Sequence, residues 1–325
     1  MHPAFSVIFL TTLIGVGQGL FLAIFTGHSY AAVQLVSAQD SVAFYGVGGL
    51  IALLFLIGGL TASFFHLGRP ERAWRAAAMW RTSWLSREVI VLPALMVLVL
   101  IYTAMQFLDL DTVLYTSETG NVLHLSLIIG TMAATATFVL YICTSMIYAT
   151  IKFIQEWACA LTVINYLLLG TASGFTLAAA LASANAPELL ALYGNWAIII
   201  TASAFFTRGG SLIRNARIKP ISTMQTAIGV RHTKIQQKSM GMQGGSMNTR
   251  DFFHHKTAAF LKVIKWSFMI LVFPVPLILL WSGVNSGSTS VLLGAFIIQY
   301  IGLIAERWFF FAQANHPQNL YYQTT

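Results

Sequence analysis

Residues 44–65 read FYGVGGLIALLFLIGGLTASFF, an apolar stretch without a single charged side chain. A helix needs roughly 20 mostly apolar residues to cross a hydrocarbon core about 30 Å thick. The stretch is long enough, and it lacks the alternation of apolar and polar residues that is typical of lipid-facing β-strands. It therefore predicts a transmembrane α-helix rather than a strand of a barrel.

The rest of the chain repeats this pattern. Of its 325 residues, 57% are hydrophobic and only 9% are charged, whereas a soluble domain carries about 25% charged residues. Eight stretches qualify as spans, and they run near Phe5 to Phe25, Phe44 to Phe65, Glu88 to Phe107, Val122 to Cys143, Cys159 to Ala182, Leu189 to Phe206, Phe260 to Trp281 and Val291 to Phe311. We therefore expect an all-α polytopic membrane protein, with residues 1–325 forming one integral-membrane domain.

The charged residues predict the orientation of these helices. With eight spans, both termini and the second, fourth and sixth loops share one side, and all 18 Lys and Arg residues lie in or beside them. The other side has no basic residue, and its acidic residues are Asp40, Asp109, Asp111, Glu118 and Glu188. Because basic loops stay in the cytoplasm, we expect both termini to be cytoplasmic. We assign the protein to a bacterial inner (plasma) membrane.

The sixth loop, residues 208–257, is the only long segment expected outside the membrane. It is rich in Gly, Gln, Met and Lys, and it has too few apolar residues to bury a core of its own. Two interpretations remain open: a basic cytoplasmic loop lying on anionic lipid, or a strap that docks a cytoplasmic subunit. Nucleic-acid binding is not expected, because the basic residues punctuate apolar runs instead of covering a water-facing fold.

The composition also limits the chemistry that the chain can carry alone. Two cysteines are too few for a Cys-ligated iron–sulfur cluster or a Cys-rich zinc site. We expect no metal site and no haem, since no two histidines face inward at matching depth. The middle of each span offers only weakly polar groups such as Gln18, Asn165 and Gln299, which disfavours ion-coupled pumps. A transporter of neutral solutes remains an alternative.

One small-residue pattern lies in the first span. Gly15 and Gly19 are four residues apart, a spacing that lets two membrane helices approach closely. This close-packing signal also recurs often by chance.

The ionisable residues that do touch the membrane gather at the cytoplasmic ends of the second and third spans. His66 lies where the second span ends, and Gly68 and Pro70 break the chain directly afterwards. Arg69 is three residues from His66, so the two would share a face of a helical connector. Glu88 opens the third span at about the same depth.

This group suits a small neutral ligand whose carbonyl oxygens need donors and whose reduction needs protons, as a quinone does. The His66 imidazole can donate a hydrogen bond and exchange a proton near neutral pH. Glu88 can relay protons to water, and Arg69 can stabilise developing negative charge. The plainer alternative is that His66 is an ordinary interfacial residue, and that Arg72, Arg75 and Arg81 are membrane anchors.

Several segments resemble the membrane anchor subunits of dimethyl-sulfoxide-reductase-type complexes. They are His66-Leu67-Gly68-Arg69-Pro70, Arg72-Ala73, Trp84-Leu85-Ser86-Arg87-Glu88, Gly17-Gln18 and Glu306-Arg307. The resemblance implies a three-subunit enzyme with a molybdopterin catalytic subunit, an iron–sulfur subunit and this quinone-reactive anchor. It associates His66 and Glu88 with the quinone reaction, and we add Gln18, Arg69, Glu306 and Arg307 to the expected binding set. No haem or iron–sulfur cluster is implied in this chain.

The sixth loop favours one branch of that family. Residues 229–232 (GVRH) and 244–250 (GGSMNTR) look more like the branch that serves cytoplasm-facing sulfite-oxidising complexes. We therefore expect sulfite:quinone oxidoreduction, with both partner subunits on the cytoplasmic side and ubiquinone or menaquinone as the acceptor. The alternatives are an anchor of a dimethyl sulfoxide reductase that oxidises quinol, and a structural tether whose quinone reacts on the iron–sulfur subunit.

Overall fold

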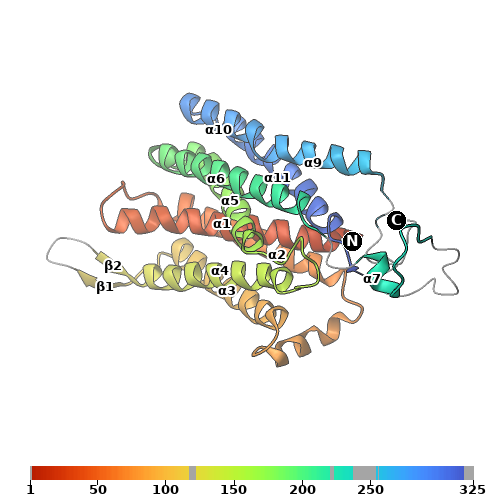
Figure 1. Ribbon diagram of the computed structural model, residues 1–325. Helices are drawn as coiled ribbons and strands as arrows, with labels where there is room; N and C mark the ends of the chain where they lie inside the picture. The colour runs from red at the N-terminus through yellow and green to blue at the C-terminus, as the bar shows by residue number, and fades with distance from the viewer. Residues whose placement is uncertain (1, 117–121, 220–222, 237–253, 255, 318–325) are drawn as a thin grey trace.

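The computed structural model describes residues 2–116, 122–219, 223–236, 254 and 256–317. Among these residues, eight helical segments are long and apolar enough to cross a membrane, which confirms the predicted polytopic all-α fold (Figure 1). The helices are α1 (Phe5–Ala32), α2 (Val47–Phe64), α3 (Trp84–Leu108), α4 (Leu125–Ala149), α5 (Ala160–Asn185), α6 (Leu190–Ala216), α7 (Met224–Ile228), α9 (Ala258–Val272), α10 (Pro274–Ser286) and α11 (Thr289–Ala312). Three short helical segments, η1 (Ser41–Gly46), η2 (Pro70–Met79) and η3 (Pro187–Leu189), precede α2, α3 and α6.

Helix α1 forms the centre of the bundle, and it packs against α2, α4, α5 and α11. Its closest approach is to α5. A Cβ atom added at Gly174 would lie 2.0 Å from the carbonyl carbon of Gly19, and one added at Gly19 would lie 2.3 Å from the carbonyl oxygen of Gly170. Only glycine fits where the two backbones cross, and Gly19 of the small-residue pattern lies at this crossing.

The seventh span consists of two helices. Helix α9 ends at Val272 and α10 begins at Pro274, with Phe273 between them. Proline has no backbone N–H to donate, so it is favoured at the start of a helix and breaks one that would continue through it. The single stretch expected from Phe260 to Trp281 therefore bends at this point.

Helix α6 is longer than its hydropathy suggested. It continues ten residues beyond the expected end at Phe206, to Ala216. Residues 208–216, expected at the start of the sixth loop, are therefore helical, and Arg208 lies buried inside the bundle. Residues 237–253 of that loop, including the 244–250 segment, lie outside the described residues.

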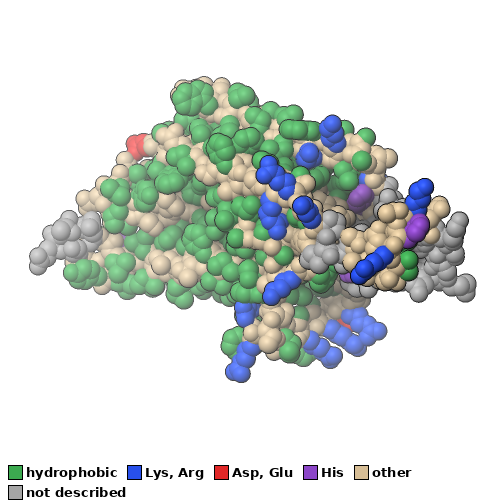
Figure 2. Space-filling view, in the orientation of Figure 1, with side chains coloured by type: hydrophobic (Ala, Val, Ile, Leu, Met, Phe, Trp, Pro, Cys, Tyr) green, Lys and Arg blue, Asp and Glu red, His purple; other side chains and the backbone are tan. Residues whose placement is uncertain are grey.

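The two ends of the bundle differ in charge. In Figure 2 the visible Lys and Arg side chains gather at one end, where α1 begins and α2, α4, α6 and α11 end; we call it the basic end. At the other end, a small hairpin joins α3 to α4. It pairs β1 (Val113–Thr116) with β2 (Val122–His124) in an antiparallel register. We call this the hairpin end, and the sequence had not indicated these strands.

Candidate functional site

A small polar cavity lies inside the basic half of the bundle, between α1, α3, α4, α5 and α11. Its volume is about 20 Å³, and its wall includes Gln18, Glu88, Thr144, Tyr166 and Arg307. A cavity needs roughly 10–15 Å³ of such volume to hold one water molecule. The cavity can therefore hold about one water molecule, which is far too little for a quinone ring.

Glu88 projects into this cavity from the start of α3. Ser83 caps the helix there, because its hydroxyl accepts a hydrogen bond from the backbone N–H of Ser86. Glu88 follows in the next turn, and its side chain is buried. The hydroxyl of Thr144 on α4 donates to its Oε1 at 2.6 Å. Since a buried carboxyl group needs polar partners, Thr144 fixes the orientation of this one.

Two further hydrogen bonds tie α1 to α4 beside the cavity. The Gln18 Nε2 donates to the carbonyl oxygen of Thr137 at 3.1 Å. The hydroxyl of Tyr141 donates to the carbonyl oxygen of Gly15, also at 3.1 Å. Both bonds reach helical carbonyl groups, so they hold polar side chains at fixed positions within an otherwise apolar core.

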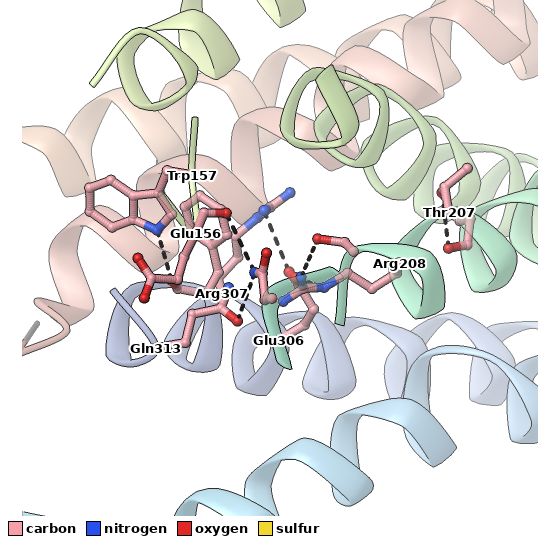
Figure 3. Close-up of polar contacts among 11 residues, drawn as sticks. Glu156, Trp157, Thr207, Arg208, Glu306, Arg307 and Gln313 are labelled. Atoms are coloured by element: carbon pink, nitrogen blue, oxygen red, sulfur yellow. Dashed lines mark hydrogen bonds and ion pairs between the residues drawn. The ribbon is translucent and has the colours of Figure 1, made fainter. Parts of the chain in front are cut away.

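Arg307, which lines the cavity from α11, belongs to a buried group of three charged side chains. The Nε atom of Arg208 lies 2.7 Å from Oε1 of Glu306, and Nη1 of Arg307 lies 3.5 Å from Oε2 of the same carboxylate. Figure 3 shows Glu306 between the two guanidinium groups. Arg307 also stacks over Tyr166, with 3.8 Å from Cζ to the ring centroid. The three ionised side chains carry two positive charges and one negative charge.

His66 and Arg69 lie apart from the cavity, in the exposed turn that follows α2. The backbone N–H of His66 donates to the carbonyl oxygen of Ser63. A Cβ atom at Gly68 would meet no neighbour within 4 Å, so the space beside this glycine is open. Partial desolvation nevertheless lowers the pKa of the His66 imidazole from its ordinary value. The neutral ring is thus favoured at pH 7.

An apolar groove between α1 and α2 reaches this turn. It has a volume of about 330 Å³ and is lined by Ser6, Phe9, Leu13, Gly58, Thr61, Ala62 and Phe65. Phe65 directly precedes His66. An apolar ligand in the groove would therefore reach the residue that precedes His66.

The sequence of the chain matches a known family along most of its length. The family model described as "DMSO reductase anchor subunit (DmsC)" matches residues 1–312. The chain belongs to this anchor subunit family. One relative, the C subunit of the sulfite dehydrogenase of Allochromatium vinosum, is 52% identical over 324 residues, which cover 100% of this chain and 99% of the relative.

The predicted site residues of this anchor subunit fall into two groups. The structure brings Gln18, Glu88 and Arg307 together around the internal cavity, with Glu306 paired to Arg307. His66 and Arg69 belong to the exposed turn. Within the described residues, no three His, Cys, Asp or Glu side chains are grouped so that they could hold a metal ion.

Sequence reasoning missed three residues of the anchor subunit's buried site. They are Arg208, Thr144 and Tyr166, which contact Glu306, Glu88 and Arg307 respectively. Thr144 and Tyr166 carry no signal in a single sequence, because Thr and Tyr are common in membrane helices. A signal did exist for Arg208. Glu306 is a carboxylate in the last span and needs a cationic partner, and Arg208 follows the expected end of the sixth span by only two residues.

Proposed function

We propose that this anchor subunit reacts with the membrane quinone pool and exchanges electrons with a partner iron–sulfur subunit of a molybdopterin oxidoreductase. The reaction proposed for the complex is sulfite:quinone oxidoreduction. Sulfite is supported because the chain is 52% identical, over 324 residues, to a subunit of a sulfite dehydrogenase. Electrons would pass from sulfite through the partner subunits to ubiquinone or menaquinone.

The observation that carries the quinone assignment is the apolar groove, whose lining ends at Phe65, the residue before His66. A quinone combines an apolar tail with a ring whose two carbonyl oxygens accept hydrogen bonds. The groove offers an apolar wall with two hydroxyl-bearing residues, Ser6 and Thr61. His66 and Arg69 would donate to the ring oxygens at its end. The quinone would supply a two-electron, two-proton acceptor, and His66 is suited to deliver a proton.

The internal cavity suits proton storage better than ring binding. Glu88 is a buried carboxyl group close to the basic end, and the cavity beside it has room for about one water molecule. If Glu88 is ionised, it balances the excess positive charge of Arg208, Glu306 and Arg307. We infer that Glu88 holds a proton that is exchanged as the quinone is reduced, and that the Thr144 hydroxyl, which donates to its Oε1, stabilises its ionised form.

The basic end is proposed to face the cytoplasm and to dock the partner subunits. The distribution of Lys and Arg supports this orientation through the positive-inside rule. The same end carries the groove, His66 and Glu88, so electrons would arrive and protons would enter on one side.

The proposal is tested by purifying the anchor with a C-terminal tag from cells that express its neighbouring genes. We expect an iron–sulfur subunit and a molybdopterin subunit to copurify, and the complex to reduce decylubiquinone or menadione when sulfite is added. Transport of a neutral solute by the chain alone, without any copurifying molybdoenzyme, would contradict the proposal.

The family description favours a second candidate, a dimethyl sulfoxide reductase anchor that oxidises quinol. The same groove and buried carboxyl group would serve the reverse reaction. The purified complex separates the two candidates directly. Reduction of dimethyl sulfoxide by decylubiquinol, with no sulfite-dependent reduction of quinone, would replace the first candidate by the second.

A further inference from the structure

A separate pocket lies at the hairpin end of the bundle, on the opposite side from the groove. It has a volume of about 390 Å³, and its walls come from the ends of α1 and α3, the loop before η1, and β2. This volume is within the range of small-molecule sites. None of the residues predicted for the quinone site lines it.

The pocket contains a buried donor that has no acceptor. Gln106 of α3 is 3% exposed, and its Oε1 accepts a hydrogen bond from the hydroxyl of Ser41 at 2.7 Å. Its Nε2 has no hydrogen-bond partner among the described residues. Buried amide groups are normally paired, so this N–H group calls for an acceptor atom in whatever occupies the pocket.

One wall of the pocket is aromatic. The His28 ring lies 4.8 Å from that of Tyr45, centroid to centroid. The Nδ1 of His28 is hydrogen-bonded to the hydroxyl of Tyr102 at 2.9 Å. Because Nδ1 is engaged and the imidazole lines the pocket, Nε2 is the ring nitrogen through which His28 would bond a ligand.

The rim adds an acceptor held in a fixed position. The carboxylate of Asp111 accepts a hydrogen bond from the backbone N–H of Ser126 at 2.9 Å and another from the Ser126 hydroxyl. The Nδ1 of His124 lies 3.7 Å from Oδ2 of Asp111. A ligand that reaches from Gln106 to this rim must accept a hydrogen bond at one end and donate one at the other.

We propose that the pocket binds the ring of a hydroquinone, with one hydroxyl oxygen accepting from Gln106 and the other hydroxyl donating to Asp111 or His28. A hydroquinone carries a donor and an acceptor on each side of an aromatic ring, which matches both the polar groups and the aromatic wall. A metal ion fits less well, since the described residues offer no group of three ligands. The proposal concerns binding only, and it rests on the proposed function for the quinol pool that supplies the ligand.

The test is photolabelling of the purified complex with a tritiated azido-ubiquinol that carries a decyl side chain, followed by mapping of the labelled peptides. We expect label in two places, the α1–α2 groove and the segments 28–45 and 106–111. Excess decylubiquinol should remove both labels, and decanol should remove neither. Gln106→Leu should lower the label at the hairpin end at least tenfold and leave the groove label unchanged.

Two further variants keep the test decisive. His28→Phe retains an aromatic ring but removes the nitrogen, and should also reduce the label at the hairpin end. Gln299→Leu removes another fully buried amide, on α11, and should leave both labels intact. Label confined to the groove, or a hairpin-end label that survives both Gln106→Leu and His28→Phe, would overturn this inference. Loss of the groove label alone would instead count against the proposed function.

Discussion

Arg208 of α6 and Glu306 of α11 form an ion pair inside the bundle, with 2.7 Å between Nε and Oε1 and both side chains at most 2% exposed. Glu306 also faces Arg307, so a single carboxylate is the counter-charge that two guanidinium groups share. An uncompensated charge in such an interior is costly. The carboxylate is therefore the member of this group whose loss should matter most.

We predict that Glu306→Gln is more destabilising than Arg208→Met. The glutamine variant leaves two buried cations without a counter-charge, and we expect it to cost about 3–5 kcal/mol of unfolding free energy. The methionine variant leaves a neutral pair of Glu306 and Arg307. Denaturant unfolding of the purified chain in detergent measures both values. An Arg208→Met variant as unstable as Glu306→Gln would show that the charge balance is not what holds these helices together.

The crossing of α1 and α5 predicts a second difference between matched variants. Gly174→Ala places a methyl group 2.0 Å from the backbone of Gly19, and overpacking of this kind costs roughly 1–3 kcal/mol. Gly294→Ala on α11 meets nothing within 4 Å and should be neutral or slightly stabilising, because alanine favours helix. Thermal unfolding of both variants in the same detergent compares them. Equal midpoints would contradict the close crossing.

The eight spans could be predicted from the sequence because hydropathy alone decides which segments enter a membrane. The C-terminal end of α6 could not be predicted in this way, because the charged Arg208 indicated the start of a loop. Its burial depends on Glu306, nearly 100 residues later, and no local pattern records such a pairing. The break at Phe273 was readable in principle from Pro274 and Pro276, but a hydropathy average passes over it.

The candidate site was predictable to a similar degree. Glu88 and Arg307 were named from the sequence, and they line the same cavity. Their common position depends on the packing of α3 and α11 around α1, which a single sequence does not specify. His66 was expected to act beside Glu88, and that relation stays a prediction. His28 lies beyond the expected end of the first span at Phe25, but α1 continues to Ala32 and carries His28 into the hairpin-end pocket.

His66 should titrate below its ordinary value of 6.5, because partial desolvation lowers its pKa. The folded chain then binds a proton at this site more weakly than the unfolded chain does. The free energy of unfolding is therefore higher above pH 6.5, where the ring is neutral in both states. It decreases as the pH falls from 6.5 towards the lowered pKa. The effect on stability should be small, since the ring is exposed. NMR of ¹³C-labelled histidine gives the midpoint, and a value at or above 6.5 would contradict the desolvation.

The proposed orientation predicts which positions are accessible from outside the cell. In a background with Cys143 and Cys159 replaced by alanine, a cysteine at Leu114 on β1 should react with a membrane-impermeant maleimide in intact spheroplasts. A cysteine at Arg231 should react only after the membrane is permeabilised. The opposite pattern would place the basic end outside and would require the partner subunits to dock there.

The central claim, that quinone reacts beside His66, is tested most directly by sulfite-dependent reduction of decylubiquinone by the assembled complex carrying His66→Asn. His232→Asn, another exposed histidine at the basic end, is the matched control. Removal of a proton-transferring side chain typically costs about 10²–10⁴-fold in rate. We predict a loss of at least about 100-fold for His66→Asn, with the partner subunits still bound and the control unchanged. Full turnover by an assembled His66→Asn complex would contradict the account.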